Sequence, residues 1–160
     1  LDSTRLITAA LENHYVNENT IMIDDPFGEF LEVIGLNEYL GWYDGLPDKT
    51  DKINYKTKYN KPIIISEFGA DALQGLHGDS LTRWTEEYQA NVYEHQINLM
   101  KRFPNLSGMT PWILSDFRSP RRNLPGIQDH WNRKGLISDR GIKKSAFYIL
   151  QKFYSENWKN

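Results

Sequence analysis

The sequence predicts an α/β fold built on a parallel sheet, and three observations support this prediction. Four short apolar runs are spread along the 160 residues, and continuous apolar runs are typical of parallel strands that are covered on both faces. One segment with helical periodicity lies between the third and fourth runs, and another follows the fourth. Strands that alternate with helices imply a parallel sheet with right-handed crossovers. The chain also has the length of one ordinary domain.

The strands are expected at the four runs RLITAA (5–10), LEVIGLN (31–37), PIIISE (62–67) and GMTPWIL (108–114). The second run contains Val33 and Ile34, whose β-branched side chains suit a strand. The third run gives the strongest signal, because three consecutive isoleucines follow a proline. Four strands can form an open sheet or half of an eight-stranded barrel, and the polar residues that follow the strands favour half of a barrel.

The longest helix is predicted over residues 85–103. Its apolar face consists of Trp84, Tyr88, Val92, His95, Leu99 and Phe103, which recur at spacings of three and four. Thr85 can cap the start of this helix, and Pro104 follows its end. A last helix is predicted over 143–155. A shorter helix is predicted over TDKINYKTKY (50–59), between the second and third strands.

The composition excludes several classes of protein. A net charge of −2 does not favour binding to nucleic acid or to a membrane surface. No apolar run has the length of a membrane-spanning helix, and no signal-peptide pattern is present, so we expect a soluble protein. The compartment is not determined; the cytoplasm or the periplasm would suit a bacterial protein. The chain has no Cys, and no His, Asp or Glu cluster has the spacing of metal ligands, so we expect neither a metal nor a cofactor.

Polar residues follow three of the predicted strands. Glu67 ends the third run, Asn37 and Tyr39 follow the second, and Ser115 and Asp116 follow the fourth. Sites in parallel α/β folds lie beyond the carboxyl ends of the strands, so these side chains are expected at one rim. A carboxylate held among aromatic side chains near a second carboxyl is what a glycosidase requires. The alternative is that Glu67 caps a turn or pairs with an arginine.

Five segments resemble one known family in their order and spacing: GLNEYLGWY (35–43), PIIISEFGAD (62–71), TEEYQ (85–89), PWILSDF (111–117) and NRKGLISDRGIKKSAFYIL (132–150). Together they resemble the C-terminal half of the catalytic barrel of glycoside hydrolase family 2, and most closely its β-glucuronidases. The resemblance extends over about residues 2–153. It implies that residues 1–160 are a partial TIM-barrel catalytic domain that contains strands five to eight of a (β/α)8 barrel.

The resemblance also implies roles for individual residues. Glu67 matches the catalytic nucleophile after strand seven. Asn37, Tyr39 and Tyr43 match the aromatic loop after strand six, in which Tyr39 would form a hydrogen bond near the nucleophile. Trp112 matches the tryptophan of strand eight that lines the sugar site, and its face suits the apolar C–H face of a sugar ring. The alternative for Trp112 is a place in the hydrophobic core.

The segment WNRKG contains Asn132 and Lys134, which match a pair that binds the uronate carboxylate in the β-glucuronidases of the family. Lysine and asparagine can form charge-assisted and amide hydrogen bonds to a carboxylate. A neutral hydroxymethyl group would leave the ammonium uncompensated, which disfavours a galactoside. Gln128 stands near the position where many glucuronidases have an arginine. Either Arg121 or Arg122 replaces that arginine, or the enzyme prefers a different or larger uronide. The alternative for Lys134 is an ordinary surface lysine.

A retaining mechanism requires a second carboxyl about 5–5.5 Å from the nucleophile. In the family this acid/base is the glutamate of an Asn-Glu pair after strand four. Asn37 and Glu38 form such a pair, but YLGWY follows it, and it lies one strand before Glu67 instead of three. Side chains alternate along a strand, so Glu38 faces away from the site if Asn37 faces it. We therefore expect the acid/base, strands one to four and the N-terminal β-sandwich domains to be absent from this chain.

The sequence thus predicts part of a retaining exo-β-glycosidase that hydrolyses terminal β-D-glucuronides, and the isolated chain is expected to be inactive. The expected partners are the carbohydrate and the missing half of the barrel, or a second copy of the chain, because a half barrel exposes two strand edges. Two other functions stay open. One is a β-galactosidase of the same family, and the other is a non-catalytic fragment that binds sugar or serves in assembly.

Overall fold

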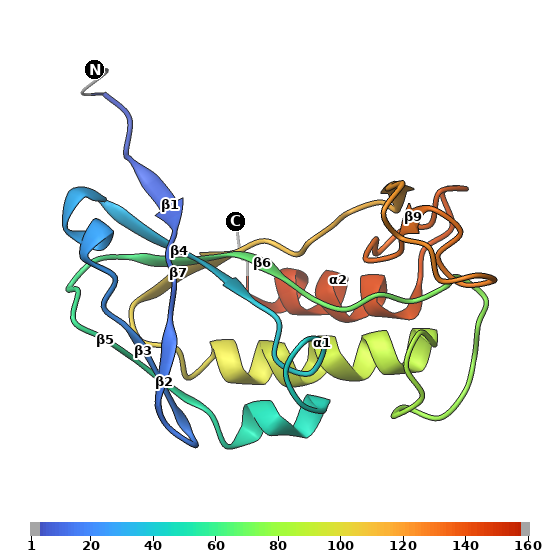
Figure 1. Ribbon diagram of the computed structural model, residues 1–160, viewed down its shortest axis with the longest axis horizontal. Coiled ribbons are helices and arrows are strands. Elements are labelled where there is room, and N and C mark those ends of the chain that lie inside the picture. The colour runs from blue at the N-terminus through green and yellow to red at the C-terminus, as the bar shows by residue number, and fades with distance from the viewer. Residues whose placement is uncertain (1–3, 158–160) are drawn as a thin grey trace.

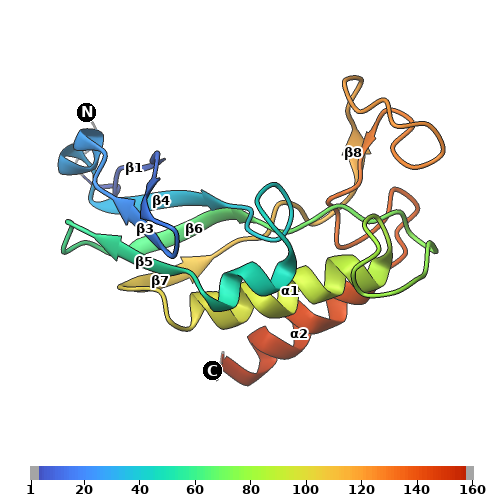
Figure 2. The same cartoon turned by 60° about the horizontal axis from the view of Figure 1, so that its bottom comes forward.

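The computed structural model describes residues 4–157, and its centre is a four-stranded parallel sheet with the order β1-β4-β6-β7 (Figure 1). The strands are β1 (Thr8–Ala10), β4 (Val33–Glu38), β6 (Ile63–Phe68) and β7 (Leu106–Met109). Each strand is added to the same edge as the chain proceeds. Both α-helices lie on one face of the sheet (Figure 2). This one-directional winding is that of a barrel segment, whereas an open doubly wound sheet has helices on both faces and a reversal of strand order.

The four predicted strands are confirmed, but the first, expected over 5–10, begins only at Thr8, and the fourth also differs in its extent. The strand was expected over 108–114, whereas β7 begins at Leu106 and ends at Met109. Beyond β7 the backbone N–H groups of Thr110 and Trp112 donate to carbonyls of β6, and the N–H of Ile113 donates to Lys134 O. The chain therefore leaves the sheet gradually, because its hydrogen-bonding partner changes from β6 to the segment around Lys134.

The two long helices are confirmed as α1 (Glu86–Met100) and α2 (Ser145–Asn157). The predicted apolar face of α1 contains Tyr88 and Val92, which pack against Trp42 and Ala70. A second face of the same helix, with Tyr93, Ile97 and Met100, packs against the buried side chains of the sheet in the main core. The sequence pattern identified only the first of these faces, because a helix packed between two neighbours buries more than one apolar stripe.

The predicted short helix over 50–59 is wrong. A 3-10 helix, η2 (Pro47–Asp51), precedes a strand, β5 (Asn54–Thr57), which pairs in parallel with β3 (Thr20–Ile23). Side chains of β5 alternate between exposed and half-buried, as expected for a strand with one covered face. The ring of Tyr55 lies 4.3 Å, centroid to centroid, from that of Phe103. This contact is distant in the chain, and the local sequence does not reveal it.

Other short elements were not predicted. The strand β2 (His14–Asn17) completes the side sheet β2-β3-β5, and the 3-10 helix η1 (Pro26–Phe30) leads into β4. A two-stranded sheet is formed by β8 (Phe117–Arg118) and β9 (Trp131–Asn132), which project beyond the carboxyl end of the main sheet (Figure 2). No helix in residues 4–157 is long and apolar enough to cross a membrane.

The start of α1 depends on its cap, which generates a test of the fold. Thr85 is buried, and its Oγ1 accepts a hydrogen bond of 3.0 Å from the N–H of Tyr88. We predict that Thr85→Ala lowers the free energy of unfolding by about 1 kcal/mol, the usual cost of losing such a cap. Thr85→Ser keeps the hydroxyl and should restore most of this loss. Chemical denaturation of the two variants measures the difference, and equal stability of Ala and Ser would contradict the assignment.

Candidate active site

Glu67 is turned toward the site by a register shift in the sheet. Leu36 pairs with Ile65, but the next residue of β4, Asn37, pairs with Glu67, so that Ser66 has no opposite residue. The Ser66 hydroxyl instead donates to Leu36 O and interacts with Asn37 Oδ1, both at 3.0 Å. Ile63 and Ile65 face the buried core, and simple alternation would send Glu67 to that side as well. The extra residue, Ser66, turns the side chain of Glu67 to the other face of the sheet, as β-bulges commonly do.

Tyr39 holds the carboxylate of Glu67 from the end of the neighbouring strand. Its Oη donates a hydrogen bond of 2.8 Å to Glu67 Oε2. Burial raises the pKa of the Tyr39 hydroxyl, and the hydrogen bond and the negative charge of Glu67 raise it further. Tyr39 therefore remains a protonated donor throughout the ordinary pH range, and Glu67 is bound as the acceptor.

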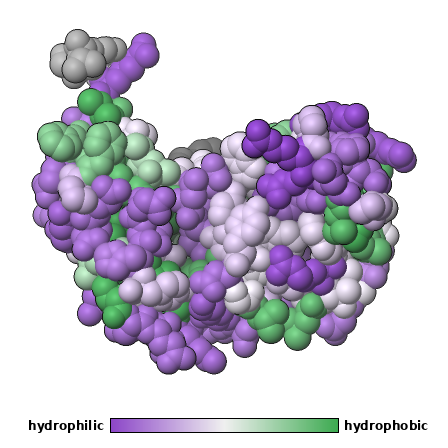
Figure 3. Space-filling model, in the orientation of Figure 1, coloured by the Kyte–Doolittle hydropathy of each residue, from purple (hydrophilic) through white to green (hydrophobic). Residues whose placement is uncertain are grey.

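A cavity of about 350 Å³ brings together most of the predicted site residues. It is lined by Tyr39, Tyr43, Glu67, Trp112, Phe117, Ser119, Arg122, Asn132 and Lys134. The remaining predicted residue, Asn37, lines an adjoining cavity on the inner face of the sheet, which also contacts Glu67 and Trp112. The volume is within the range of about 300–1,000 Å³ that small-molecule sites have. In Figure 3 the outline of the molecule dips between the end that carries β1 and the end that carries β9.

Lys134 is a buried lysine and not a surface residue. Its side chain is 1% exposed, and its ammonium donates to Asp71 Oδ2 at 2.5 Å and to Tyr43 Oη at 2.8 Å. Asn132 supports the same segment, because its Oδ1 accepts a hydrogen bond of 3.0 Å from the N–H of Lys134. The expectation that this ammonium is uncompensated without a uronate is therefore wrong, since Asp71 already balances its charge.

Arg122 adds a second cation to the cavity wall. Burial of Tyr43 acts to raise its pKa, but the hydrogen bonds and charges of Lys134 and Arg122 outweigh burial and lower that pKa. Arg122 is half-buried and lines the cavity, whereas Arg121 is exposed and does not. Gln128 is also absent from the lining, and its Oε1 accepts a hydrogen bond from the N–H of Leu124. Of the residues considered as replacements for the missing arginine, the structure brings Arg122 to the site.

Asp116 was expected at the rim and is instead a structural residue. Its Oδ1 accepts hydrogen bonds of 2.8 Å from the N–H of Gly135 and from the ammonium of Lys144, and Arg133 lies 3.5 Å from its Oδ2. Burial raises the pKa of Asp116 and lowers that of Lys144, although their attraction opposes both shifts. Lys144 also donates to Ala72 O, so this cluster ties the start of α2 to the loop after β6.

The side chains of Glu38, on β4, and Glu67, on β6, point to opposite faces of the sheet. Glu38 pairs with Phe68, whose ring lies in the hydrophobic core, whereas Asn37 pairs with Glu67. Among the residues that line the two cavities, Glu67 is the one carboxylate, so a second carboxyl for acid/base chemistry is not part of this wall. In the part of the chain that the structure describes, no three His, Asp or Glu side chains are grouped to hold a metal ion.

Sequence reasoning missed the role of Asp71 and the participation of Phe117 and Ser119 in the cavity wall. Asp71 lies at the end of the segment SEFGAD, and an acidic residue shortly after a strand end is the signal that could have identified it. Its partner Lys134 is 63 residues away, and no spacing rule predicts that contact.

The winding of the sheet and the position of Glu67 at its carboxyl edge define the chain as part of a parallel α/β barrel with its site at the usual end of the strands. More specifically, the chain belongs to glycosyl hydrolase family 2, because the TIM barrel domain of that family matches residues 1–157. The four parallel strands are therefore part of a TIM barrel.

Known members of the family are similar to this chain along most of its length. A β-glucuronidase of Streptococcus agalactiae is 36% identical over 71% of this chain and 20% of its own length. The human β-glucuronidase is 33% identical over 99% of this chain and 24% of its own length. The crystal structure of a β-galacturonidase from Eisenbergiella tayi bound to galacturonate has a TM-score of 0.67 and 25% identity, and covers 79% of this chain and 24% of that chain. The chain thus spans about a quarter of the length of these relatives.

The buried pair of Asp71 and Lys134 generates a test of the site's framework. Removing one partner of a buried ion pair leaves the other charge without compensation, which typically costs about 3–5 kcal/mol. We predict a loss of this size in the free energy of unfolding for Asp71→Asn in the whole protein, measured by denaturant titration. The double variant Asp71→Asn/Lys134→Met should recover part of it. Glu156→Gln, which breaks an exposed pair with Lys152, is the matched control and should change little.

Proposed function

We propose that the whole protein is a retaining exo-β-glycosidase that hydrolyses terminal β-D-glucuronides, with Glu67 as its nucleophile. The observation that carries this proposal is the cavity in which Glu67, held by Tyr39, faces Trp112 and the two cations Arg122 and Lys134. The names of the relatives, β-glucuronidases and a β-galacturonidase, support the choice of a uronide.

In this proposal Glu67 attacks the anomeric carbon, and the bond to the leaving group breaks as the covalent glycosyl-enzyme forms. Tyr39 orients the attacking carboxylate through its hydrogen bond to Oε2. The acid/base protonates the departing oxygen and then activates the water that releases the sugar. Because no second carboxylate lines the two cavities, the acid/base is supplied from outside the wall described here.

The uronate carboxylate is proposed to bind between Arg122 and Lys134. Lys134 has three ammonium protons, of which Asp71 and Tyr43 accept two, so one remains for the substrate. Arg122 supplies a guanidinium that can hold a carboxylate through two parallel hydrogen bonds. A neutral galactoside would not compensate Arg122 and is therefore disfavoured. A β-galacturonide carries the same carboxylate, so this pair of cations distinguishes acid from neutral sugar but not one uronide from its epimer.

A non-catalytic sugar-binding protein would use the same aromatic and cationic wall without a nucleophile. The two functions differ in whether Glu67 becomes covalently attached to the sugar. The lining of the cavity by Glu67 and the hydrogen bond from Tyr39 favour the enzyme, because a merely binding site does not require a fixed carboxylate beside the sugar.

Removal of the nucleophile tests the proposed chemistry. We predict that Glu67→Gln in the whole protein lowers kcat on an aryl β-glucuronide by several orders of magnitude, because the covalent route is lost. A 2-fluoro glucuronide should label a peptide that contains SEFGA in the unaltered protein, as read by mass spectrometry. The exposed Glu94 on α1 provides the control variant Glu94→Gln, which should retain its activity. A label on another peptide would reject Glu67 as the nucleophile.

Arg122 tests the uronide preference more cleanly than Lys134, because its removal leaves no buried carboxylate unpaired. We predict that Arg122→Gln lowers kcat/KM on the aryl β-glucuronide. The expected loss of transition-state stabilisation is about 1.5–3 kcal/mol, the cost of a lost charged hydrogen bond. The aryl β-galactoside should change little. Arg121→Gln removes the same charge from the neighbouring exposed position and serves as the control. Equal losses on both substrates, or a stronger preference of the unaltered protein for the galactoside, would exclude uronide specificity.

A further inference from the structure

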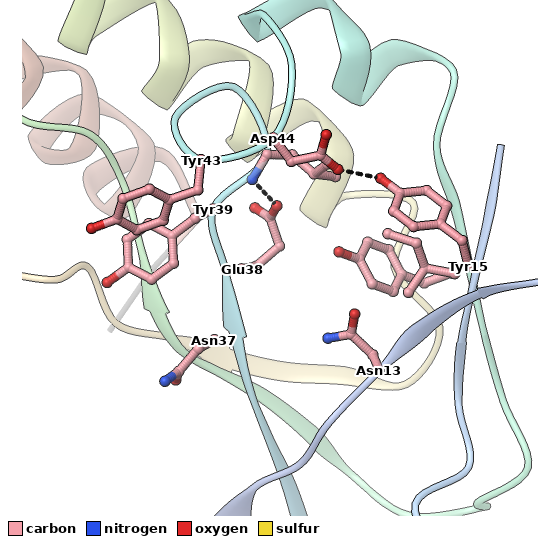
Figure 4. A pocket seen from close by; sticks show the side chains of 10 residues that line it. Asn13, Tyr15, Asn37, Glu38, Tyr39, Tyr43 and Asp44 are labelled. Carbon is pink, nitrogen blue, oxygen red and sulfur yellow. Dashed lines mark hydrogen bonds between the residues drawn. The ribbon is translucent and has the colours of Figure 1, made fainter. Parts of the chain in front are cut away.

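A small cavity of about 140 Å³ adjoins the active-site wall at the start of the turn that follows β4. Figure 4 shows side chains that line it: Asn13, Tyr15, Glu38 and Asp44 lie on one side of β4, and the rings of Tyr39 and Tyr43, which also line it, lie on the other. The cavity is also lined by Tyr55 from β5. One of the carboxyl groups that line this cavity belongs to Glu38, which takes no part in the proposed chemistry.

The carboxyl group of Glu38 is attached to the backbone of the active-site loop. Glu38 is 3% exposed, and its Oε1 accepts a hydrogen bond of 2.5 Å from the N–H of Leu40. Its Oε2 is buried and has no hydrogen-bond partner among the described residues. Leu40 directly follows Tyr39, so the hydrogen bond fixes the backbone at the point where Tyr39 turns toward Glu67.

The segment after Glu38 is a tight turn that carries two residues of the site. Tyr39 O accepts hydrogen bonds of 3.0 Å from the N–H groups of Trp42 and Tyr43, and the N–H of Gly41 donates to Asp44 O. Tyr39 contacts Glu67, and Tyr43 contacts Lys134. A displacement at the start of this turn therefore moves both hydroxyl groups relative to the site.

We propose that Glu38 is a positioning residue, which fixes the turn that places Tyr39 against Glu67 and Tyr43 against Lys134. This inference rests on the proposed function, because Glu38 can affect the rate in this way only if Glu67 is the reacting carboxylate. It assigns Glu38 neither the acid/base role nor a contact with the sugar. Its action passes through the N–H of Leu40 and the hydroxyl of Tyr39.

The surroundings of Glu38 favour its uncharged form. Burial raises the pKa of Glu38 to about 8; the N–H of Leu40 opposes this shift, and the negative charge of Asp44 adds to it. Lys49, from the 3-10 helix η2 after the turn, pairs with Asp44 at 2.5 Å, and Tyr15 also donates to Asp44.

The other elements packed against the turn offer Glu38 no compensating charge. Tyr55 faces it from β5, and its own pKa is raised by burial and by the charge of Glu38. From α1, Gln96 donates to Leu40 O. The guanidinium of Arg83 is engaged with Trp42 O and lies over the ring of Trp42. Ionisation of Glu38 thus creates a buried anion beside Asp44, and the turn is expected to shift to relieve it.

The sign of the pH effect follows from the raised pKa. The folded state binds the proton of Glu38 more tightly than the unfolded chain, so its contribution to stability is fully present below about pH 4.5 and is lost as the pH rises to about 8. The positioning of Tyr39 should weaken over the upper part of this window, which gives kcat a descending limb near pH 8.

The experiment measures kcat and KM of the whole protein on an aryl β-glucuronide from pH 5 to 9. We expect Glu38→Leu, which cannot accept the N–H of Leu40, to lower kcat by about tenfold or more at pH 6, since a displacement of about 1 Å can cost a hundredfold. Glu38→Gln keeps the acceptor without the titration, so it should restore most of this loss. The acid/base titrates in both proteins, so the ratio of the kcat of Glu38→Gln to that of the unaltered protein should rise from pH 6 to pH 9. Glu18→Gln, at an exposed turn, should leave kcat and its pH profile unchanged. An undiminished kcat in Glu38→Leu, or a ratio of the kcat of Glu38→Gln to that of the unaltered protein that stays constant from pH 6 to pH 9, would overturn the proposal.

A double-mutant comparison separates positioning from general stability. If Glu38 acts through Tyr39, Glu38→Leu should lower kcat much less in a Tyr39→Phe background than alone. Equal losses in both backgrounds would reject this route. If Glu38→Leu does not fold, the pH profile of Glu38→Gln still decides the question. Labelling by the 2-fluoro glucuronide distinguishes the two hypotheses: a label away from Glu67 refutes the proposed function, whereas a label on Glu67 with no effect at Glu38 refutes only the positioning role.

Discussion

The register shift between β4 and β6 is the constraint on which the site depends. An uninterrupted alternation would bury Glu67 beside Ile63 and Ile65, where a carboxylate has no partner. Because Ser66 is left without an opposite residue, Glu67 instead lies on the same side as Asn37 and reaches Tyr39. A strand can thus be apolar enough to form the centre of a barrel wall and still present an ionisable group at its end.

Buried charges hold the other wall of the cavity in place. The segment that carries Lys134 has no long strand or helix of its own, and its backbone is attached to Asp71, Asp116 and Gln89. Each of these contacts is buried, so a missing partner would leave an unpaired polar group at high cost. The result is a rigid wall whose lysine is already oriented and neutralised before any ligand arrives. For the proposed uronide substrate, such a preorganised cation would reduce the cost of ordering the site on binding.

The turn after β4 connects these two walls. Tyr39 contacts the carboxylate on β6, and Tyr43 contacts the ammonium of Lys134, so one short segment touches both sides of the cavity. The turn is itself held from behind by Glu38 and by Gln96 of α1. The geometry of the cavity therefore reflects groups that lie outside it, on the helix side of the sheet.

The sequence alone determined the parallel α/β class, the four main strands and both long helices, because apolar runs, helical periodicity and a capping residue such as Thr85 are local signals. The family followed from the resemblance of five segments to known members. It also identified Glu67 and the aromatic and amide residues that the structure collects around it. The tertiary structure decided the rest. The strand β5 forms where a helix was expected, because β3 offers an edge that no local pattern encodes. Lys134 finds Asp71 across 63 residues, and the shift at Ser66 depends on its partner strand. Pairing between distant segments depends on which surfaces the fold brings together, so the local sequence around each segment does not predict it.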